Sequence, residues 1–209
     1  MGSQLTRILR VAAAALGIAA LIAANSERTG PVANFFSFFT IEANILTVVV
    51  FAVGGLLDPR GTRWAYFRGA VTLYMVITGI VYAALLSDVP VGLSSPWINT
   101  ALHRILPVLI LVDWLFRPPW PRVPAARSLA WLVFPLAYFG YSLIRGPHAN
   151  FYPYPFLDPR PNGYDHVVAY AIVLSVAMAA LAYAVWRIGD QRLAAGEHDV
   201  EPRVRPRTG

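Results

Sequence analysis

Six apolar stretches of roughly membrane-crossing length constrain the fold of this chain more than any other feature. A helix rises about 1.5 Å per residue, so about 20 apolar residues cross the hydrocarbon core of a bilayer. The fifth stretch is short and carries Pro135, which predicts a thin or kinked span. We therefore expect an all-α, polytopic membrane protein built as a six-transmembrane-helix bundle. The expected spans are residues 5–24, 35–57, 69–86, 98–116, 129–144 and 167–186.

The composition agrees with an integral membrane protein. Of the 209 residues, 57% are hydrophobic and only 13% are charged, against about 25% charged in an ordinary soluble domain. The absence of cysteine excludes disulfides and thiolate zinc sites. No GxSxG, P-loop, GxGxxG or HExxH motif occurs at a meaningful position, so we expect neither a metal nor a cofactor.

The basic residues predict the orientation of the bundle. All 17 are arginines, which suggests a GC-rich bacterial genome. They lie in short loops and the C-terminal tail, where membrane orientation explains the net charge of +6 better than nucleic-acid binding does. The positive-inside rule then places both termini in the cytoplasm, in a multi-pass protein of the bacterial inner (cytoplasmic) membrane. The arginines assigned to the cytoplasmic side are Arg7, Arg10, Arg60, Arg63, Arg68, Arg117, Arg122, Arg127, Arg187, Arg192, Arg203, Arg205 and Arg207.

The two ends of the chain differ in character. Arg7 and Arg10 followed by an alanine-rich apolar run are also typical of a signal peptide. We favour a retained helix, because cleavage would remove one helix of the bundle. Residues 1–192 are expected to form the transmembrane domain. Residues 193–209 form a polar tail with two prolines and are expected to be disordered.

Two polar residues lie at matching predicted depth in different spans, Thr40 in FFSFFTIEANIL and His103 in NTALHRILPVLILVDWL. Each stands about five residues, or about 7–8 Å, inside the outer end of its span. If the two helices touch, a threonine hydroxyl and an imidazole at one depth would suit a nucleophile and its base. Alone, each residue also has a structural explanation: a buried histidine with one hydrogen bond, and a threonine bonded to its own i−4 carbonyl.

Further polar residues share the helix faces of this pair. Asn99 lies one turn before His103, and Pro107 lies four residues after it. Since proline has no N–H, we expect the helix to bend there and to leave the His103 carbonyl free. Asn44 lies one turn after Thr40 on the same face. Either asparagine would suit the role of orienting the imidazole or stabilising an oxyanion.

Three more ionisable residues fall inside the predicted spans, and each needs a reason because insertion of a charge costs about 2.5–3.5 kcal/mol. Asp113, near a cytoplasmic end, is expected to pair with a loop arginine. Glu42 and Arg104 suit a structural ion pair. Together with His103 they would also suit a proton or ligand relay in a non-catalytic transport or lipid-binding protein.

The loop after the fifth span, RGPHANFYPYPFLDPRPNGYDH, alternates aromatic residues with proline. Tyr152, Tyr154 and Phe156 stand in a run that favours extended backbone, and Asp158 begins a turn. Two interpretations fit this loop: a lid over the outer mouth of a cavity, or an interfacial aromatic belt.

The stretches FFSFFTIEANIL, LHRILPVLILVDW and YPYPFLDP together resemble the androgen-induced and androgen-dependent TFPI-regulating membrane protein family, and more closely its actinobacterial relatives. The resemblance covers the second to sixth spans. It implies a six-helix hydrolase of fatty acid esters of hydroxy fatty acids, with Thr40 at the nucleophile position, His103 at the histidine position and Tyr154 to Leu157 matching the family's Tyr-Pro-Phe-Leu loop. The chain departs from the eukaryotic pattern at Ala43, where that pattern has Asp, and in a His-to-Leu-Pro gap shorter by one residue.

The sequence thus predicts an intramembrane, threonine-dependent lipid ester hydrolase, with Thr40 as nucleophile and His103 as general base. Residues expected to bind substrate or support the site are Glu42, Asn44, Asn99, Arg104, Tyr154, Phe156 and Asp158. The expected partners are the bilayer and a fatty acid ester. The alternatives are the relay protein described above and a purely structural membrane subunit.

Overall fold

The computed structural model describes residues 3–89, 95–117 and 123–198 of the chain. The described residues are all-α, and six of their helical segments are long and apolar enough to cross a membrane. This confirms the predicted fold class. The segments are Gln4–Glu27, Phe39–Leu56, Thr62–Leu86, Pro96–Phe116, Ala125–Ala149 and Pro159–Arg192.

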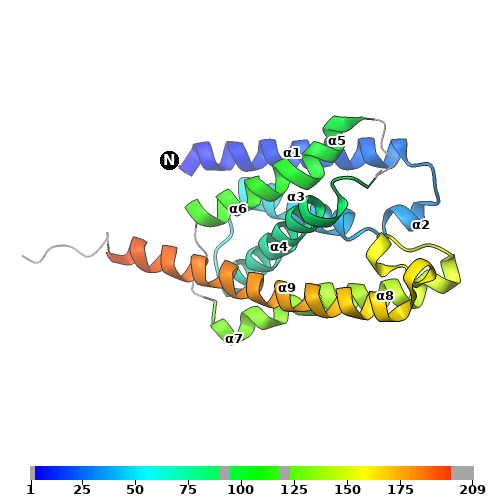
Figure 1. Cartoon of the computed structure of the whole chain (residues 1–209). Helices are drawn as coiled ribbons and strands as arrows, with labels where there is room; N and C mark the ends of the chain where they lie inside the picture. Colours follow the sequence, from blue (N-terminus) through cyan, green and yellow to red (C-terminus); the bar gives the residue numbers. More distant parts are fainter. Residues whose placement is uncertain (1–2, 90–94, 118–122, 199–209) are drawn as a thin grey trace, which may run out of the picture.

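The first half of the bundle is built from long helices with short connections (Figure 1). Helix α1 (Ser3–Glu27) is followed by the single turn α2 (Val32–Phe35) and by α3 (Phe39–Leu56). Helix α4 (Thr62–Val81) continues into the π-helix η1 (Tyr82–Leu86). The next span joins α5 (Pro96–Thr100), the π-helix η2 (Ala101–Ile105) and α6 (Leu106–Phe116). Both π-helices therefore lie inside membrane spans.

The second half consists of two spans joined by the aromatic loop. The fifth span comprises α7 (Ala125–Ser128), the 3₁₀ turn η3 (Leu129–Leu132) and α8 (Val133–Ala149). The 3₁₀ turn η4 (Pro155–Leu157) lies in the loop before α9 (Pro159–His198). Helix α9 packs against α4, α6 and α7.

The helices pack closely where small residues face a neighbour. Helix α1 lies along α3, and a Cβ placed on Gly55 of α3 would stand 2.7 Å from Val11 Cγ2 and 3.0 Å from the Arg7 carbonyl oxygen of α1. Only glycine lets the two backbones approach this far. Close packing of this kind stabilises helix pairs in lipid, where apolar side chains gain little by leaving the surrounding hydrocarbon.

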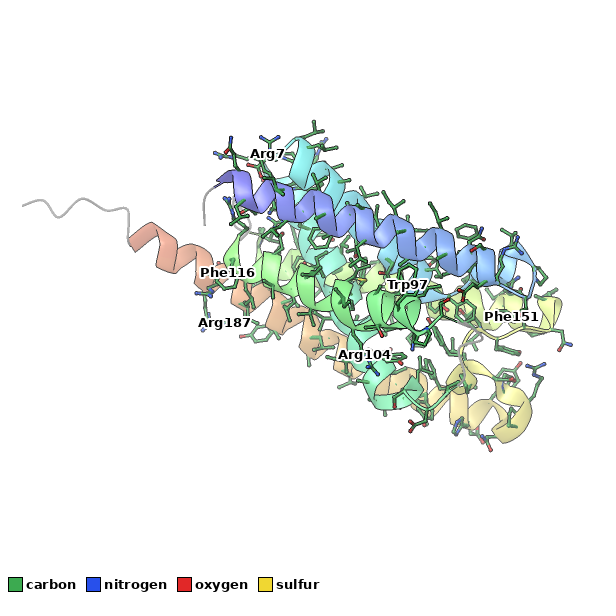
Figure 2. All side chains as sticks on the ribbon, turned by 90° about the horizontal axis from the view of Figure 1, so that it is seen from above. Arg7, Trp97, Arg104, Phe116, Phe151 and Arg187 are labelled. Carbon is green, nitrogen blue, oxygen red and sulfur yellow. The ribbon has the colours of Figure 1, made fainter. Side chains whose placement is uncertain are left out.

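Both ends of the described chain lie at one end of the bundle. Figure 2 shows Arg7 of the first span and Arg187 of the last toward this end, with Trp97 and Phe151 toward the opposite one. An even number of spans requires this arrangement. We call the opposite end, formed by residues 28–38 and 150–158, the outer end, since the arginine distribution predicts that it faces away from the cytoplasm.

A buried ionic cluster joins α1, α4 and α6 with the residues that follow α3, at the end of the bundle opposite the outer end. The Asp113 carboxylate accepts two hydrogen bonds from Arg10, at 2.7 and 3.1 Å, and one from Arg68, at 2.8 Å. Arg10 also pairs with Asp58 at 3.2 Å. The predicted pairing of Asp113 with arginine is confirmed, but its side chain is only 8% exposed and its partners lie on α1 and α4 rather than in loops.

Several predicted boundaries differ from the structure. The second span begins at Phe39, because residues 32–35 form a separate turn, so Thr40 belongs to the first turn of α3. The fifth span was predicted to be thin or kinked. It is not thin, since it runs over Ala125–Ala149, and the 3₁₀ turn Leu129–Leu132 interrupts it just before Pro135. Helix α9 continues past residue 192 to His198, while residues 199–209, the rest of the predicted disordered tail, lie outside the described part.

Candidate functional site

A cavity of about 430 Å³ opens within the outer end of the bundle. This volume falls in the range of about 300–1,000 Å³ that is typical of small-molecule sites. Six parts of the chain form its walls. They are α1, the end of α2, the start of α3, η1 with the residues after it, η2, and the aromatic loop with the start of α9. The lining residues are Ala24, Phe35, Phe38, Thr40, Ile41, Tyr82, Leu86, Val89, Leu102, His103, Tyr152, Pro153, Tyr154, Pro155, Asp158 and Pro161. Most are apolar, and both Thr40 and His103 face this space.

Thr40 is held at the N-terminus of α3 by a residue far along the chain. The first four N–H groups of a helix have no intrahelical acceptor, and the N-cap position, Phe38, offers no side-chain cap. The Thr40 N–H instead donates to the Tyr154 hydroxyl at 3.2 Å. The Thr40 Oγ1 and the Tyr154 hydroxyl are also hydrogen-bonded at 3.2 Å. Tyr154 therefore caps the helix and fixes the threonine hydroxyl at the cavity wall.

Packing of its ring holds Tyr154 in place. The ring stacks on Phe156 with centroids 5.2 Å apart and an interplanar angle of 8°, and it meets Phe38 edge-on. Only 9% of the residue is exposed. Burial raises the pKa of the Tyr154 phenol above its ordinary value, which keeps the phenol protonated at neutral pH. This side chain is a fixed hydrogen-bond donor rather than a base.

His103 is oriented by its own helix and by a stacked ring. Its Nδ1 lies 3.2 Å from the Asn99 carbonyl oxygen. A carbonyl can only accept, so Nδ1 carries the proton, and in the neutral imidazole Nε2 is left as an acceptor. The Tyr82 ring stacks on the imidazole at a centroid distance of 4.4 Å. Tyr82 was not among the predicted site residues, since nothing in the sequence relates an aromatic residue of the third span to a histidine of the fourth.

Pro107 removes one backbone hydrogen bond from the helix beside His103, and Asn44 of α3 donates to the carbonyl that is left without a backbone partner. In the π-helix η2 the Leu106 N–H donates to the Ala101 carbonyl, and Pro107 has no N–H to give. The Leu102 carbonyl consequently accepts from Asn44 Nδ2 at 3.1 Å. The same amide donates to the Thr40 carbonyl at 2.8 Å. From the sequence we expected proline to free the His103 carbonyl. The carbonyl that is bonded by a distant side chain is instead that of Leu102, because in a π-helix the acceptor lies five residues before the donor rather than four.

The side-chain amides of the two predicted asparagines both donate hydrogen bonds within the bundle. Besides the bonds of Asn44, the Asn99 Nδ2 donates to the Tyr82 hydroxyl at 2.7 Å. The Asn99 side chain thus holds Tyr82, while its backbone carbonyl orients His103. The Oδ1 atoms of both asparagines are buried and have no partner among the described residues.

The charged residues of the predicted relay do not meet. Within the described residues no ion pair joins Glu42 to Arg104, and neither lines the large cavity. The Arg104 guanidinium lies over the Tyr82 ring at 5.6 Å, and Glu42 is half-buried. The structure therefore gives no support to a Glu42–Arg104 bridge.

The aromatic loop forms part of the cavity wall. Phe156 is buried between Tyr154 and Tyr170, which excludes a belt of these rings facing lipid. At the cavity edge the Arg160 guanidinium hydrogen-bonds Asp158 at 2.6 and 2.8 Å and holds the pKa of that carboxyl below its ordinary value. The loop is fixed at both sides of Tyr154.

The fold and the cavity together define a polytopic α-helical membrane protein with an internal, mostly apolar site at one end. Comparison of the chain with known protein families, curated proteins and solved structures finds no match. The described residues contain no group of three or more His, Asp or Glu side chains arranged to hold a metal ion.

No hydrogen bond joins Thr40 to His103 among the described residues, because the Thr40 hydroxyl is bonded to Tyr154. The two side chains come from different spans and line one cavity. Hydrogen bonds between catalytic groups are often long in the absence of substrate and shorten in the complex.

Proposed function

We propose that this protein is an intramembrane hydrolase of lipid esters, with Thr40 as the nucleophile and His103 as the general base. The observation that carries the proposal is the presence of an oriented imidazole and a fixed threonine hydroxyl on one apolar cavity. A hydroxyl is a weak nucleophile until a base removes its proton. Among the described residues that line this cavity, His103 is the only histidine, and its Nε2 can accept that proton.

In the acylation step, Thr40 Oγ1 attacks the ester carbonyl carbon and its proton passes to His103 Nε2. The bond from that carbon to the alcohol oxygen then breaks, and the alcohol leaves with the proton from His103. The Asn99 carbonyl accepts from Nδ1 throughout and stabilises the charged imidazolium. The products are the free alcohol and an acyl ester of Thr40.

Deacylation repeats these roles with water. A water molecule attacks the acyl carbon, His103 takes its proton, and Thr40 Oγ1 leaves and regains a proton from His103. The threonine methyl group crowds the attack in both steps, so we expect slow turnover. The two steps together consume one ester and one water molecule and release one alcohol and one fatty acid.

The lining of the cavity supports an apolar substrate. Aromatic and aliphatic side chains form most of its surface. Its polar side chains are Thr40, Tyr82, His103, Tyr152, Tyr154 and Asp158. This arrangement suits an ester held at the outer end with its hydrocarbon chains among the helices. The resemblance of the Thr40, His103 and Tyr154–Leu157 stretches to the androgen-induced and androgen-dependent TFPI-regulating family supports esters of hydroxy fatty acids in particular. By the positive-inside rule, the site would face outward from the bacterial cytoplasmic membrane.

Hydrolysis of a branched fatty acid ester by the purified protein tests the role of His103. We expect His103→Ala to lower kcat/KM by about 10²–10⁴-fold, the usual contribution of a general base. His148→Ala is the matched control, because His148 Nδ1 makes the same bond to its i−4 carbonyl, at 2.9 Å, at an exposed position outside the cavity. Equal rates for the two variants would contradict the proposal.

A further inference from the structure

An ester hydrolase must stabilise the negative charge that develops on the carbonyl oxygen, and the structure limits which groups can do so. The following inference rests on the proposed function. The Asn44 amide donates both of its hydrogens to carbonyl groups. Asn99 donates to Tyr82 and does not line the cavity. The Arg104 guanidinium lies over the Tyr82 ring, and the residue is exposed and does not line the cavity. Of the phenols that line the cavity, Tyr154 is the one that is hydrogen-bonded to Thr40 in the described part of the chain, both at Oγ1 and at the backbone N–H.

We propose that Tyr154 is a catalytic residue whose hydroxyl donates a hydrogen bond to the oxyanion formed when Thr40 attacks. The Thr40 N–H assists by donating to the oxygen of that hydroxyl. In hydrolases that use a serine nucleophile, the nucleophile's own N–H commonly forms part of the oxyanion site. Here that N–H lies 3.2 Å from the Tyr154 oxygen, and the same oxygen lies 3.2 Å from Thr40 Oγ1. The phenol therefore stands next to the atom at which the tetrahedral intermediate forms.

The direction of the hydrogen bonds favours this role. The Tyr154 oxygen already accepts the Thr40 N–H, which polarises the phenolic O–H and strengthens its donation. In the resting site that proton has Thr40 Oγ1 as its partner. As the new carbon–oxygen bond forms, negative charge builds on the carbonyl oxygen, which is bonded to the same carbon as Oγ1. The phenolic proton then turns to it, while the threonine proton goes to His103.

The surroundings of Tyr154 meet the requirement for a preorganised donor. Its ring is fixed between Phe38 and Phe156 in a water-poor site. The α3 helix contributes the positive end of its dipole from the Thr40 side. A donor held in this way needs no reorganisation during the reaction, which is the main source of stabilisation in oxyanion sites.

Tyr154→Phe tests the proposal, because it removes the hydroxyl and keeps the ring contacts. We expect kcat to fall by about 10²–10³-fold, the usual cost of losing one oxyanion donor, with little change in KM. The control is Tyr138→Phe, which removes an equally buried phenol whose hydrogen bond, 2.8 Å long, goes to the Ser37 carbonyl and not to Thr40. It should retain wild-type kcat.

Inhibitor binding separates catalysis from structure. A trifluoromethyl ketone analogue adds to Thr40 and places an oxyanion at the Tyr154 hydroxyl, whereas an ether analogue of the substrate creates no charge. Tyr154→Phe should weaken the ketone by about the same factor as kcat and leave the ether unaffected. Equal weakening of both ligands, or wild-type kcat in this variant, would overturn the role of Tyr154.

Two further outcomes keep this test independent of the proposed function and of folding. If wild-type protein and Thr40→Ala hydrolyse the ester equally, Thr40 is not the nucleophile, and the proposed mechanism fails together with the inference. If Thr40→Ala is inactive and Tyr154→Phe is fully active, only the role of Tyr154 fails. Should Tyr154→Phe not fold, 3,5-difluorotyrosine at position 154 retains the hydroxyl and makes it a stronger donor. It should bind the ketone more tightly than the wild type does, and unchanged affinity would overturn the proposal.

Discussion

Thr40→Ala should abolish ester hydrolysis, with kcat/KM reduced by at least about 10³-fold, because the variant removes the atom that forms the covalent intermediate. The bundle should remain folded. The Thr40 N–H still donates to Tyr154 after the substitution, and the change removes only a hydroxyl and a methyl group at a site that borders an existing cavity. The measurement is the initial rate of fatty acid release from a branched ester by purified protein in detergent.

Thr40→Ser is the matched variant for this prediction. It keeps Oγ and removes the methyl group that hinders attack, so we expect activity at or above the wild-type level. Thr47→Ala provides a second control, since Thr47 lies on the same helix with its hydroxyl bonded to its own i−4 carbonyl at 2.8 Å. Loss of activity in all three variants would assign the effect to helix packing rather than to chemistry.

Asp113→Asn should strongly destabilise the bundle at the end opposite the outer end. The carboxylate neutralises Arg10 and Arg68, whose side chains are only 6% and 8% exposed. Removing one partner of a buried ion pair leaves uncompensated charge and costs about 3–5 kcal/mol. Asp58 pairs with Arg10 as well, but no other carboxylate is hydrogen-bonded to Arg68 in the described part of the chain. The measurement is the free energy of unfolding in mixed micelles.

The control for Asp113 is Asp158→Asn, which removes the same charge from a pair whose arginine is 53% exposed. Exposed pairs contribute about 0–1 kcal/mol, so the free energy of unfolding should change little. If Asp113→Asn behaves like Asp158→Asn, the buried cluster does not stabilise the bundle.

The six spans could be predicted from the sequence because long apolar runs leave a chain few choices in lipid, where every backbone polar group needs an internal partner. The boundaries were less accurate. The second span begins at Phe39 rather than near Phe35, since α2 satisfies its backbone in a separate turn that hydropathy does not distinguish from the helix. The spacing of residues along a helix predicts which side chains share a face, but it predicts the first and last residues of the helix poorly.

Matching depth and the resemblance singled out Thr40 and His103 as a pair, on the condition that their helices touch, and both residues line one cavity. Their hydrogen bonds could not be predicted. The hydrogen bond between Thr40 and Tyr154 joins residues 114 positions apart. The hydrogen bond from Asn44 to the Leu102 carbonyl depends on the π-helix η2, which no local sequence pattern predicts. Long-range polar contacts of this kind depend on helix rotation and loop conformation, which one sequence does not encode locally.

Covalent trapping of Thr40 is the sharpest test of whether Thr40 is the nucleophile and His103 its base. A lipophilic fluorophosphonate would phosphonylate the nucleophile and release fluoride, and peptide mass spectrometry would then locate the adduct. We expect one adduct per chain on Thr40, absent from Thr40→Ala and formed more slowly in His103→Ala. An unmodified Thr40 in protein that hydrolyses the ester, or labelling of Thr40 at the same rate without His103, would contradict it.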